Sequence, residues 1–331
     1  MKQMLYILLT TFYLLNFNSC DSMNGRNAPA EAIHIHRFDK DLFKLITDDT
    51  PTIQQQIVAD YPNMLKVIGL SIFHTQYTQD SIFLERIVNH YSEENLNRLY
   101  RDAIKIYDDI ENVESDLSSG FQYLKTCFPT IQIPAVYMHV SGLQQNVLID
   151  DSLLSISIDR YLGFDYPLYK DFFNDYQRLK MTPERVVPDY LRAWLLSEFP
   201  FTGNDKMLLD RMIYEGKIKY IIHHALPKVL PEVLMGYTPQ NYQWCKQNEM
   251  YLWRTIIERK HLYSVDDVAT TVRYFADRPS DFISDEAPGD LGSWVGWQIV
   301  TEYMEKTKSS VEALMTNTDY QDILTKSKYK P

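Results

Sequence analysis

A glutamate and a glycine stand side by side in the middle of the segment "LLDRMIYEGKIKYIIHH", which runs from Leu208 to His224. The apolar residues of this segment recur at helical spacing and predict an amphipathic helix. Glycine weakens a helix by about 1 kcal/mol relative to alanine, so Gly216 is expected where another backbone or a bulky ring comes close. The carboxylate of Glu215 could pair with a nearby basic side chain, or it could serve a metal ion or a proton transfer.

One chemistry that uses such a helix is that of the HExxH zinc peptidases. In these enzymes two histidines at i and i+4 hold the metal, and the glutamate between them is the general base. A later helix supplies the third ligand, which in one branch is a glutamate often followed by glycine. The corresponding first helix would lie about 20 residues upstream of Glu215, in the segment "TPERVVPDYLRAWLLSEF".

The upstream segment lacks both histidines. Pro188 stands in place of the first histidine, Asp189 in place of the glutamate, and Arg192 in place of the second histidine. Proline has no ligand atom and a guanidinium is always cationic, so a zinc site of this design cannot form. We therefore predict no metal and no cofactor, and we hypothesise that Arg192 forms an ion pair with Glu215. A hydrolase built on Asp189 and Glu215 as acid and base is the alternative.

Other motifs give weaker signals. His34 and His36 would share one face of a strand, and a solvated strand edge is the interpretation that we favour. His223 and His224 would point to different sides of a helix, which does not suit two ligands of one metal. The chain contains no G-x-S-x-G, P-loop or G-x-G-x-x-G motif.

Aromatic residues in two segments could line a pocket. "PGDLGSWVGWQIV" carries Trp294 and Trp297 on a predicted helix, where Gly296 would let another element approach closely. "IDRYLGFDYPLY" supplies Tyr161 and Tyr166. Tight helix packing is one interpretation of the tryptophans. The other is the aromatic wall of a cleft that binds a peptide or a glycan.

The N-terminus predicts export. Residues 1–19 contain Lys2 and then an apolar stretch that is too short to span a bilayer, as in a secretory signal. Because Cys20 follows this stretch directly, we predict a lipoprotein signal peptide with Cys20 as the lipid-bearing residue. An ordinary secreted protein with a free thiol is the alternative. Residues 20–32 are small and polar and predict a flexible tether, and 33–331 would form a single globular domain.

Composition narrows the classes of partner. The net charge is −11 and no long basic run occurs, which disfavours nucleic acid as a partner. The 24 tyrosines predict a dense core with many hydroxyl groups that need hydrogen-bond partners. Cys127 and Cys245 are expected to be separate buried thiols, although an oxidising compartment would permit a bridge between them.

The predicted architecture is α+β and mostly helical, with a small central sheet among many helices. Short β-branched and aromatic runs between residues 133 and 163 predict the sheet, with hairpins at Ser141-Gly142 and around Asp150. Helices are expected before and after it, and one of them would run from Pro239 past residue 258. Their predicted caps are Thr50, Ser92, Thr182, Thr238 and Ser293.

An ordered series of segments resembles the GldB-type gliding-motility lipoprotein family of Bacteroidetes. These segments are "RFDKDLF", "ISIDRYLG", "LLDRMIYEGK", "GYTPQNYQWC", "NEMYLW", "APGDLGSWVGWQIVTEYM" and the terminal "SKYKP". The family is itself similar to a group of predicted zinc peptidases, which implies a zincin-like fold with a degenerate metal site. On this view Glu215 takes the place of the third ligand, while Pro188, Asp189 and Arg192 are what is left of the first motif.

The resemblance implies a role in gliding motility or in the linked protein-secretion machinery. We expect a non-catalytic, lipid-anchored protein of the cell envelope that binds a protein or peptide partner through the former peptidase cleft. It would be held in the outer membrane by acylated Cys20 and would face the periplasm, because no acidic run of the surface-display kind follows this cysteine. The alternatives are the altered hydrolase and a glycan-binding lipoprotein.

Overall fold

A computed structural model describes residues 32–76, 81–265 and 268–331 of the chain. This part is a single compact unit, mostly helical, with a small four-stranded mixed sheet, as the predicted fold class requires. Three predictions fall outside the described residues, namely the signal peptide (1–19), the lipid attachment at Cys20 and the tether up to residue 31. Within the described ranges, no helix combines the length and the apolar character needed to cross a membrane.

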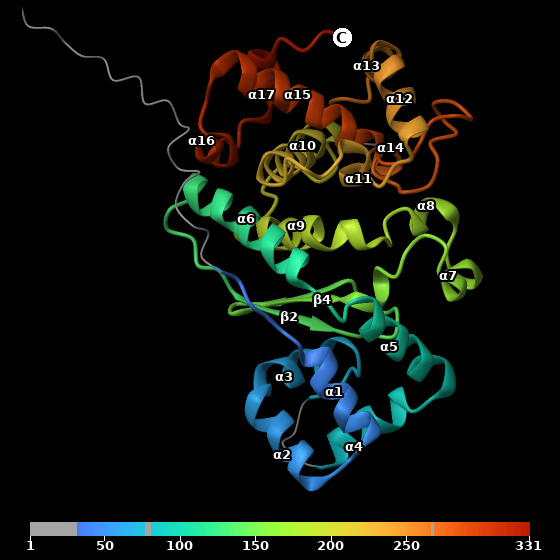
Figure 1. Cartoon of the computed structure of the whole chain (residues 1–331). Helices are drawn as coiled ribbons and strands as arrows, with labels where there is room; N and C mark the ends of the chain where they lie inside the picture. Colours follow the sequence, from blue (N-terminus) through green and yellow to red (C-terminus); the bar gives the residue numbers. More distant parts are fainter. Residues whose placement is uncertain (1–31, 77–80, 266–267) are drawn as a thin grey trace, which may run out of the picture. The chain divides into compact units, whose positions relative to one another are not determined.

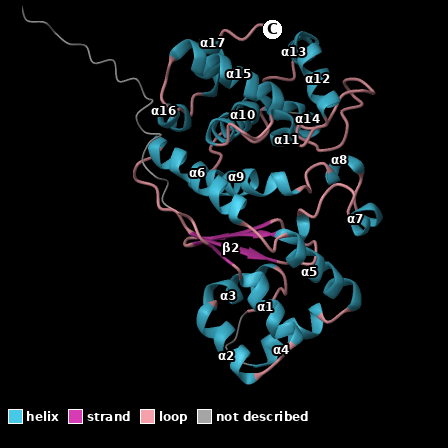
Figure 2. Ribbon diagram, viewed as in Figure 1, coloured by secondary structure: helices cyan, strands magenta, loops and turns pink. Residues whose placement is uncertain are grey.

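Helices make up most of this unit, and Figure 2 shows how they surround the sheet. In chain order the helices are α1 (Phe38–Thr47), α2 (Pro51–Asp60), α3 (Pro62–Ser71), α4 (Ser81–Tyr91), α5 (Glu94–Ile106), α6 (Glu111–Cys127), α7 (Pro167–Phe172), α8 (Asp175–Arg178), α9 (Val186–Glu198), α10 (Leu208–Ala225), α11 (Pro231–Met235), α12 (Pro239–Gln247), α13 (Glu249–Glu258), α14 (Val268–Tyr274), α15 (Leu291–Thr307), α16 (Val311–Thr316) and α17 (Tyr320–Ser327). Two short 3-10 turns are η2 (Ile158–Arg160) and η3 (Pro183–Arg185).

The sheet has the strand order β1-β2-β4-β3. Its strands are β1 (Ile35–His36), β2 (Ala135–His139), β3 (Val147–Asp150) and β4 (Leu153–Ser157). The β1–β2 and β2–β4 pairs are parallel, whereas β3 and β4 form an antiparallel hairpin across the turn at residues 151 and 152. In Figure 1 helices α1–α5 lie on one side of this sheet, and α6 and α9 lie on the other.

Two of the five predicted caps are confirmed. Thr50 and Thr238 accept hydrogen bonds from backbone N–H groups in the first turns of α2 and α12. The other three predictions were wrong. The Ser92 hydroxyl bonds back to the Val88 carbonyl (2.7 Å), and the Thr182 side chain makes no capping bond. Ser293 lies inside the first turn of α15, whose cap position belongs to Asp290.

Two other helix and strand boundaries also differ from the prediction. The helix expected from Pro239 to beyond residue 258 is divided at Asn248, whose side-chain amide donates to the Trp244 carbonyl at 2.8 Å. The strand expected from Ile33 onwards is limited to two residues, because α1 begins at Phe38. His36 in this strand is exposed, and its ring stacks on Tyr137 of β2.

The glycine beside Glu215 marks the closest helix crossing in the core. A Cβ atom added to Gly216 would overlap the backbone of Gly296 in α15, and one added to Gly296 would overlap the Met212 carbonyl in α10. The expectation that each glycine lets another element approach is thus confirmed, and the two glycines serve the same contact. Helix α10 also packs against α6, α9 and α17, so it is buried nearly all round.

The "IDRYLG" segment is anchored by a buried carboxylate. Asp159 accepts hydrogen bonds from the backbone N–H groups of Ser141 (3.0 Å) and Leu143 (2.7 Å), and from the Ser157 hydroxyl. Arg160 donates to the Leu143 carbonyl at 3.2 Å. Both side chains therefore hold the loop after β2 against the end of β4.

Many tyrosine hydroxyls donate hydrogen bonds to backbone carbonyls deep in the core. Tyr91 donates to Val140, Tyr107 to Tyr161, and Tyr237 to Gly289, at 2.6–2.7 Å. Such bonds allow large polar rings to be buried without leaving the hydroxyl unsatisfied. Among the cysteines of the described residues, Cys127 is half-buried and Cys245 is buried, and both are free thiols.

Candidate functional site

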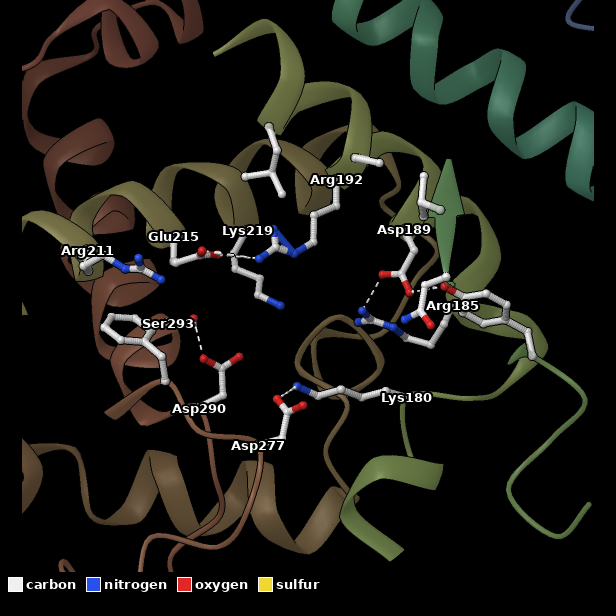
Figure 3. Close-up of a pocket in the computed structure, with 16 residues that line it drawn as sticks. Lys180, Arg185, Asp189, Arg192, Arg211, Glu215, Lys219, Asp277, Asp290 and Ser293 are labelled. Carbon is white, nitrogen blue, oxygen red and sulfur yellow. Dashed lines mark hydrogen bonds and ion pairs between the residues drawn. The ribbon is translucent and has the colours of Figure 1, made fainter. Parts of the chain in front are cut away.

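A cavity of about 420 Å³ opens between α9, α10 and the start of α15. The residues that line it include five basic and four acidic side chains (Figure 3). Its lining is Asn146, Val147, Tyr161, Lys180, Arg185, Asp189, Arg192, Ala193, Leu196, Arg211, Glu215, Lys219, Phe275, Asp277, Asp290 and Ser293.

Helical spacing explains how α10 contributes to the cavity. Arg211, Glu215 and Lys219 are four residues apart, which places them along one side of the helix. Met212 and Gly216 are also four residues apart, but they lie on another side of the helix, where α10 contacts α15. One side of α10 is thus used for tight packing, while another presents charges to the cavity.

Glu215 and Arg192 form the ion pair that the sequence analysis hypothesised. Arg192 Nη2 lies 3.0 Å from one carboxylate oxygen of Glu215 and 3.3 Å from the other. The Glu215 side chain is 10% exposed and that of Arg192 is 30% exposed, so water screens the pair only in part. The second terminal nitrogen of this guanidinium, Nη1, is buried and has no hydrogen-bond partner.

Asp189 is held by two donors on the other side of the cavity. Arg185 Nη2 donates to Asp189 at 2.5 Å, and the Tyr161 hydroxyl donates to its second oxygen at 2.9 Å. The same guanidinium also donates through Nη1 to the carbonyls of Val233 (2.8 Å) and Leu234 (2.7 Å). These bonds fix the orientation of Asp189 and join the start of α9 to α11.

Lys219 places a buried amine at the centre of the site. Its Nζ donates to the Leu234 carbonyl at 2.7 Å, and the residue is only 6% exposed. The pKa of this amine is lowered to about 7, mainly by burial; the carboxylate of Asp290 opposes the change, and the nearby Arg185 and Arg192 contribute to it. Figure 3 shows the amine reaching into the space between the Arg192–Glu215 pair and Asp290.

The remaining wall comes from segments that are distant in sequence. Lys180 pairs with Asp277 at 2.5 Å across 97 residues. Asp290 has a left-handed backbone conformation with φ of 55°, and its carboxylate accepts from the Ser293 hydroxyl at 2.6 Å. The sequence analysis assigned none of these four residues to the site, and named Ser293 only as a helix cap, since nothing in local spacing brings them to α9 and α10.

Arg211 is the cation with the fewest polar contacts. Its guanidinium lies 5.3 Å from the ring centroid of Phe275 and 5.6 Å from that of Phe201. The Nε atom is buried without a hydrogen-bond partner, and no carboxylate of the described residues forms an ion pair with it. The regular spacing of Arg211, Glu215 and Lys219 was a signal by which the sequence could have found both cations.

Four of the predicted site residues line the cavity, namely Asp189, Arg192, Glu215 and Tyr161. Four others do not. Pro188 is buried in the first turn of α9. Trp294 is 1% exposed and Trp297 is 5% exposed, because α15 is buried in the core, and Trp297 packs against His223. Tyr166 instead donates to Asp102 at 2.9 Å, away from the cavity.

The side chains that line the cavity are suited to bind a charged ligand rather than a metal ion. No histidine or cysteine lines the cavity, and across the described part of the chain no three His, Cys, Asp or Glu side chains gather so that they could hold a metal ion. Glu215 and Asp189 both accept bonds from guanidinium groups. The guanidinium nitrogens of the lining that have no partner among the described residues belong to Arg185, Arg192 and Arg211.

Fold and site define a mostly helical α+β protein with a charged cavity between three helices. The family model described as "Gliding motility protein GldB" matches residues 23–331. The chain belongs to this family, and the expected association with gliding motility is therefore confirmed at the level of the family. No curated protein and no solved structure shows a significant match to the chain.

Proposed function

We propose that this chain is a non-catalytic lipoprotein of the cell envelope that binds a protein or peptide partner of the gliding machinery, or of the linked secretion machinery, through the cavity between α9 and α10. A lipid on Cys20 would attach it to the outer membrane, facing the periplasm. The family supports the link to motility. The Arg192–Glu215 pair is the single observation that carries the proposed binding role.

That pair is what a peptidase site would not contain. A peptidase of the HExxH type needs its glutamate free to ligate a metal, whereas Glu215 is held by a guanidinium at 3.0 Å. A guanidinium is a permanent donor that cannot accept a metal or a proton. We infer that the cavity is a remnant of such a site in which recognition has replaced cleavage.

The alternatives have less support. Acid–base hydrolysis would require one carboxylate to donate a proton and another to accept one. Asp189 and Glu215 are each engaged by an arginine, and Asp189 also accepts from Tyr161. A glycan site was argued from Trp294 and Trp297, and both indoles are buried in the core.

A photo-crosslinking amino acid at Asn146 tests the proposal in living cells. Asn146 is exposed and lines the cavity, so a partner seated there would come within reach of the crosslinker. We expect a specific crosslinked species, detected by immunoblot and identified by mass spectrometry as an envelope protein. The matched control is the same substitution at Ile82, which is 71% exposed on α4.

The Ile82 variant should give no such species at equal expression. Crosslinking of the same partner from both positions, or from neither, would contradict binding through the cavity. The expected membrane attachment is tested in the same cells, since Cys20→Ser should move the chain from the membrane fraction to the soluble fraction.

A further inference from the structure

We propose that the cavity recognises the free carboxylate at the C-terminus of a peptide, with Arg211 and Lys219 as the contacting cations and Arg192 beside them. This inference rests on the proposed function, because it names the part of the partner that would enter the cavity. The observation that supports it is that the ion pairs of the cavity leave a positive charge and several N–H groups without a partner among the described residues.

The charges of the cavity pair off incompletely. Three ion pairs join Arg192 to Glu215, Arg185 to Asp189, and Lys180 to Asp277. The fourth carboxylate, that of Asp290, accepts from Ser293. When Lys219 is protonated, the five cations and four carboxylates of the lining leave one positive charge in excess. A monoanion would balance it, whereas a phosphate dianion would not.

Three buried guanidinium nitrogens of the cavity lining also lack an acceptor. Arg185 Nε, Arg192 Nη1 and Arg211 Nε have no hydrogen-bond partner among the described residues. A buried donor without a partner is unfavourable, and native structures seldom leave one unless water or a ligand satisfies it. Arginine presents its N–H groups in a planar fork that matches the two oxygens of a carboxylate. All three open donors come from guanidinium groups, which favours a carboxylate as their acceptor.

Lys219 adds a charge that the fold itself does not require. Its amine is buried and donates a hydrogen bond to the Leu234 carbonyl, which already accepts from Arg185 at 2.7 Å. Removing the amine would therefore leave that carbonyl satisfied. A buried ammonium that opposes folding and satisfies no otherwise open group is expected where it serves a ligand.

The size and walls of the cavity favour the end of a chain. A volume of about 420 Å³ lies in the range of sites for small ligands, and it is too small for a folded domain. Val147, Leu196 and Phe275 give it an apolar wall that could hold the last side chain of a peptide. Glu215 is paired with the Arg192 guanidinium and Asp290 accepts from the Ser293 hydroxyl, so a ligand carboxylate would meet donors as well as acids.

Binding to two short acetylated peptides tests this inference. Both have the same glycine–serine sequence ending in phenylalanine, and one has a free C-terminus while the other is amidated. With the full-length protein in detergent micelles, calorimetry should show that the free acid binds at least about tenfold more tightly. Arg211→Gln and Lys219→Met should each remove most of this preference, whereas Lys228→Met, an exposed position outside the cavity, should keep it.

The outcomes separate this inference from the proposed function. Equal binding of the acid and the amide, or tighter binding of inorganic phosphate than of the acid, would overturn the inference. An Asn146 crosslink to a partner together with equal binding of the two peptides would leave only the proposed function standing. Preference for the acid without any cavity crosslink in cells would support the carboxylate site and count against the proposed partner.

Discussion

Replacing Gly296 by alanine is expected to destabilise the protein by at least about 3 kcal/mol, although alanine is the better helix former. The added methyl group would overlap the Met212 carbonyl, which is backbone and cannot move without shifting α10. Because α10 also carries Arg211, Glu215 and Lys219, a shift of this helix would disturb the cavity as well as the core.

Chemical denaturation monitored by tryptophan fluorescence would measure this effect. Gly69→Ala in α3 is the matched control, because its methyl group would meet Thr75 O at 3.1 Å and the Phe83 ring at 3.2 Å, distances that a small adjustment can relieve. We expect that control to change the free energy of unfolding by no more than about 1 kcal/mol. Equal stabilities of the two variants would show that α10 and α15 do not cross at these glycines.

Replacing Lys219 by methionine is expected to raise stability at neutral pH by at least about 1 kcal/mol. Methionine keeps most of the buried volume, and Leu234 O keeps its bond from Arg185. The pKa of this lysine is lowered from 10.5 to about 7 in the folded protein, mainly by burial. One pKa unit corresponds to about 1.4 kcal/mol, so the ammonium form opposes folding by several times that amount.

The sign of the pH dependence follows from proton binding. Between the folded pKa of about 7 and the unfolded value of 10.5, the unfolded chain holds a proton on Lys219 that the folded chain lacks. Lys219 therefore makes stability rise with pH across this window, and below it the unfavourable contribution is constant. The charged groups that act on the amine are Asp290, which raises its pKa, and Arg185, Arg192 and Lys180, which lower it.

Melting temperatures at several pH values would check this prediction. The gain from Lys219→Met should be largest near pH 7 and should shrink towards pH 10. Lys228→Met, which removes an exposed lysine, should follow the parent protein at every pH. A loss of stability in Lys219→Met at pH 7 would mean that the buried ammonium group of Lys219 stabilises the folded state, which would contradict the prediction.

Local pattern in the sequence was sufficient for part of this site. The Glu-Gly pair correctly predicted a close helix contact at Gly216, because a glycine in a helix interior is unfavourable without such a reason. Arg192 and Glu215 stand at two of the ligand positions of an HExxH-type site, and this correspondence correctly suggested their ion pair. Both inferences concern residues whose helices were well defined by periodicity.

The rest of the site depends on tertiary contacts that periodicity does not reveal. Helix α10 is buried nearly all round, so its apolar pattern did not distinguish the side with Arg211 and Lys219 from the packing side. Asp277 reaches Lys180 only through the fold. Trp294 and Trp297 were assigned to a possible cleft because an indole suits a ligand as well as it suits a core, and α15 turned out to be central.

The most direct test of recognition without cleavage is a search for peptide turnover. Full-length protein in detergent, with and without added zinc, would be incubated with acetylated peptides and followed by mass spectrometry. Our account predicts that the peptides stay intact at the rate seen in buffer alone. Cleavage that a chelator abolishes, and that Glu215→Gln slows by about a hundredfold or more, would contradict it.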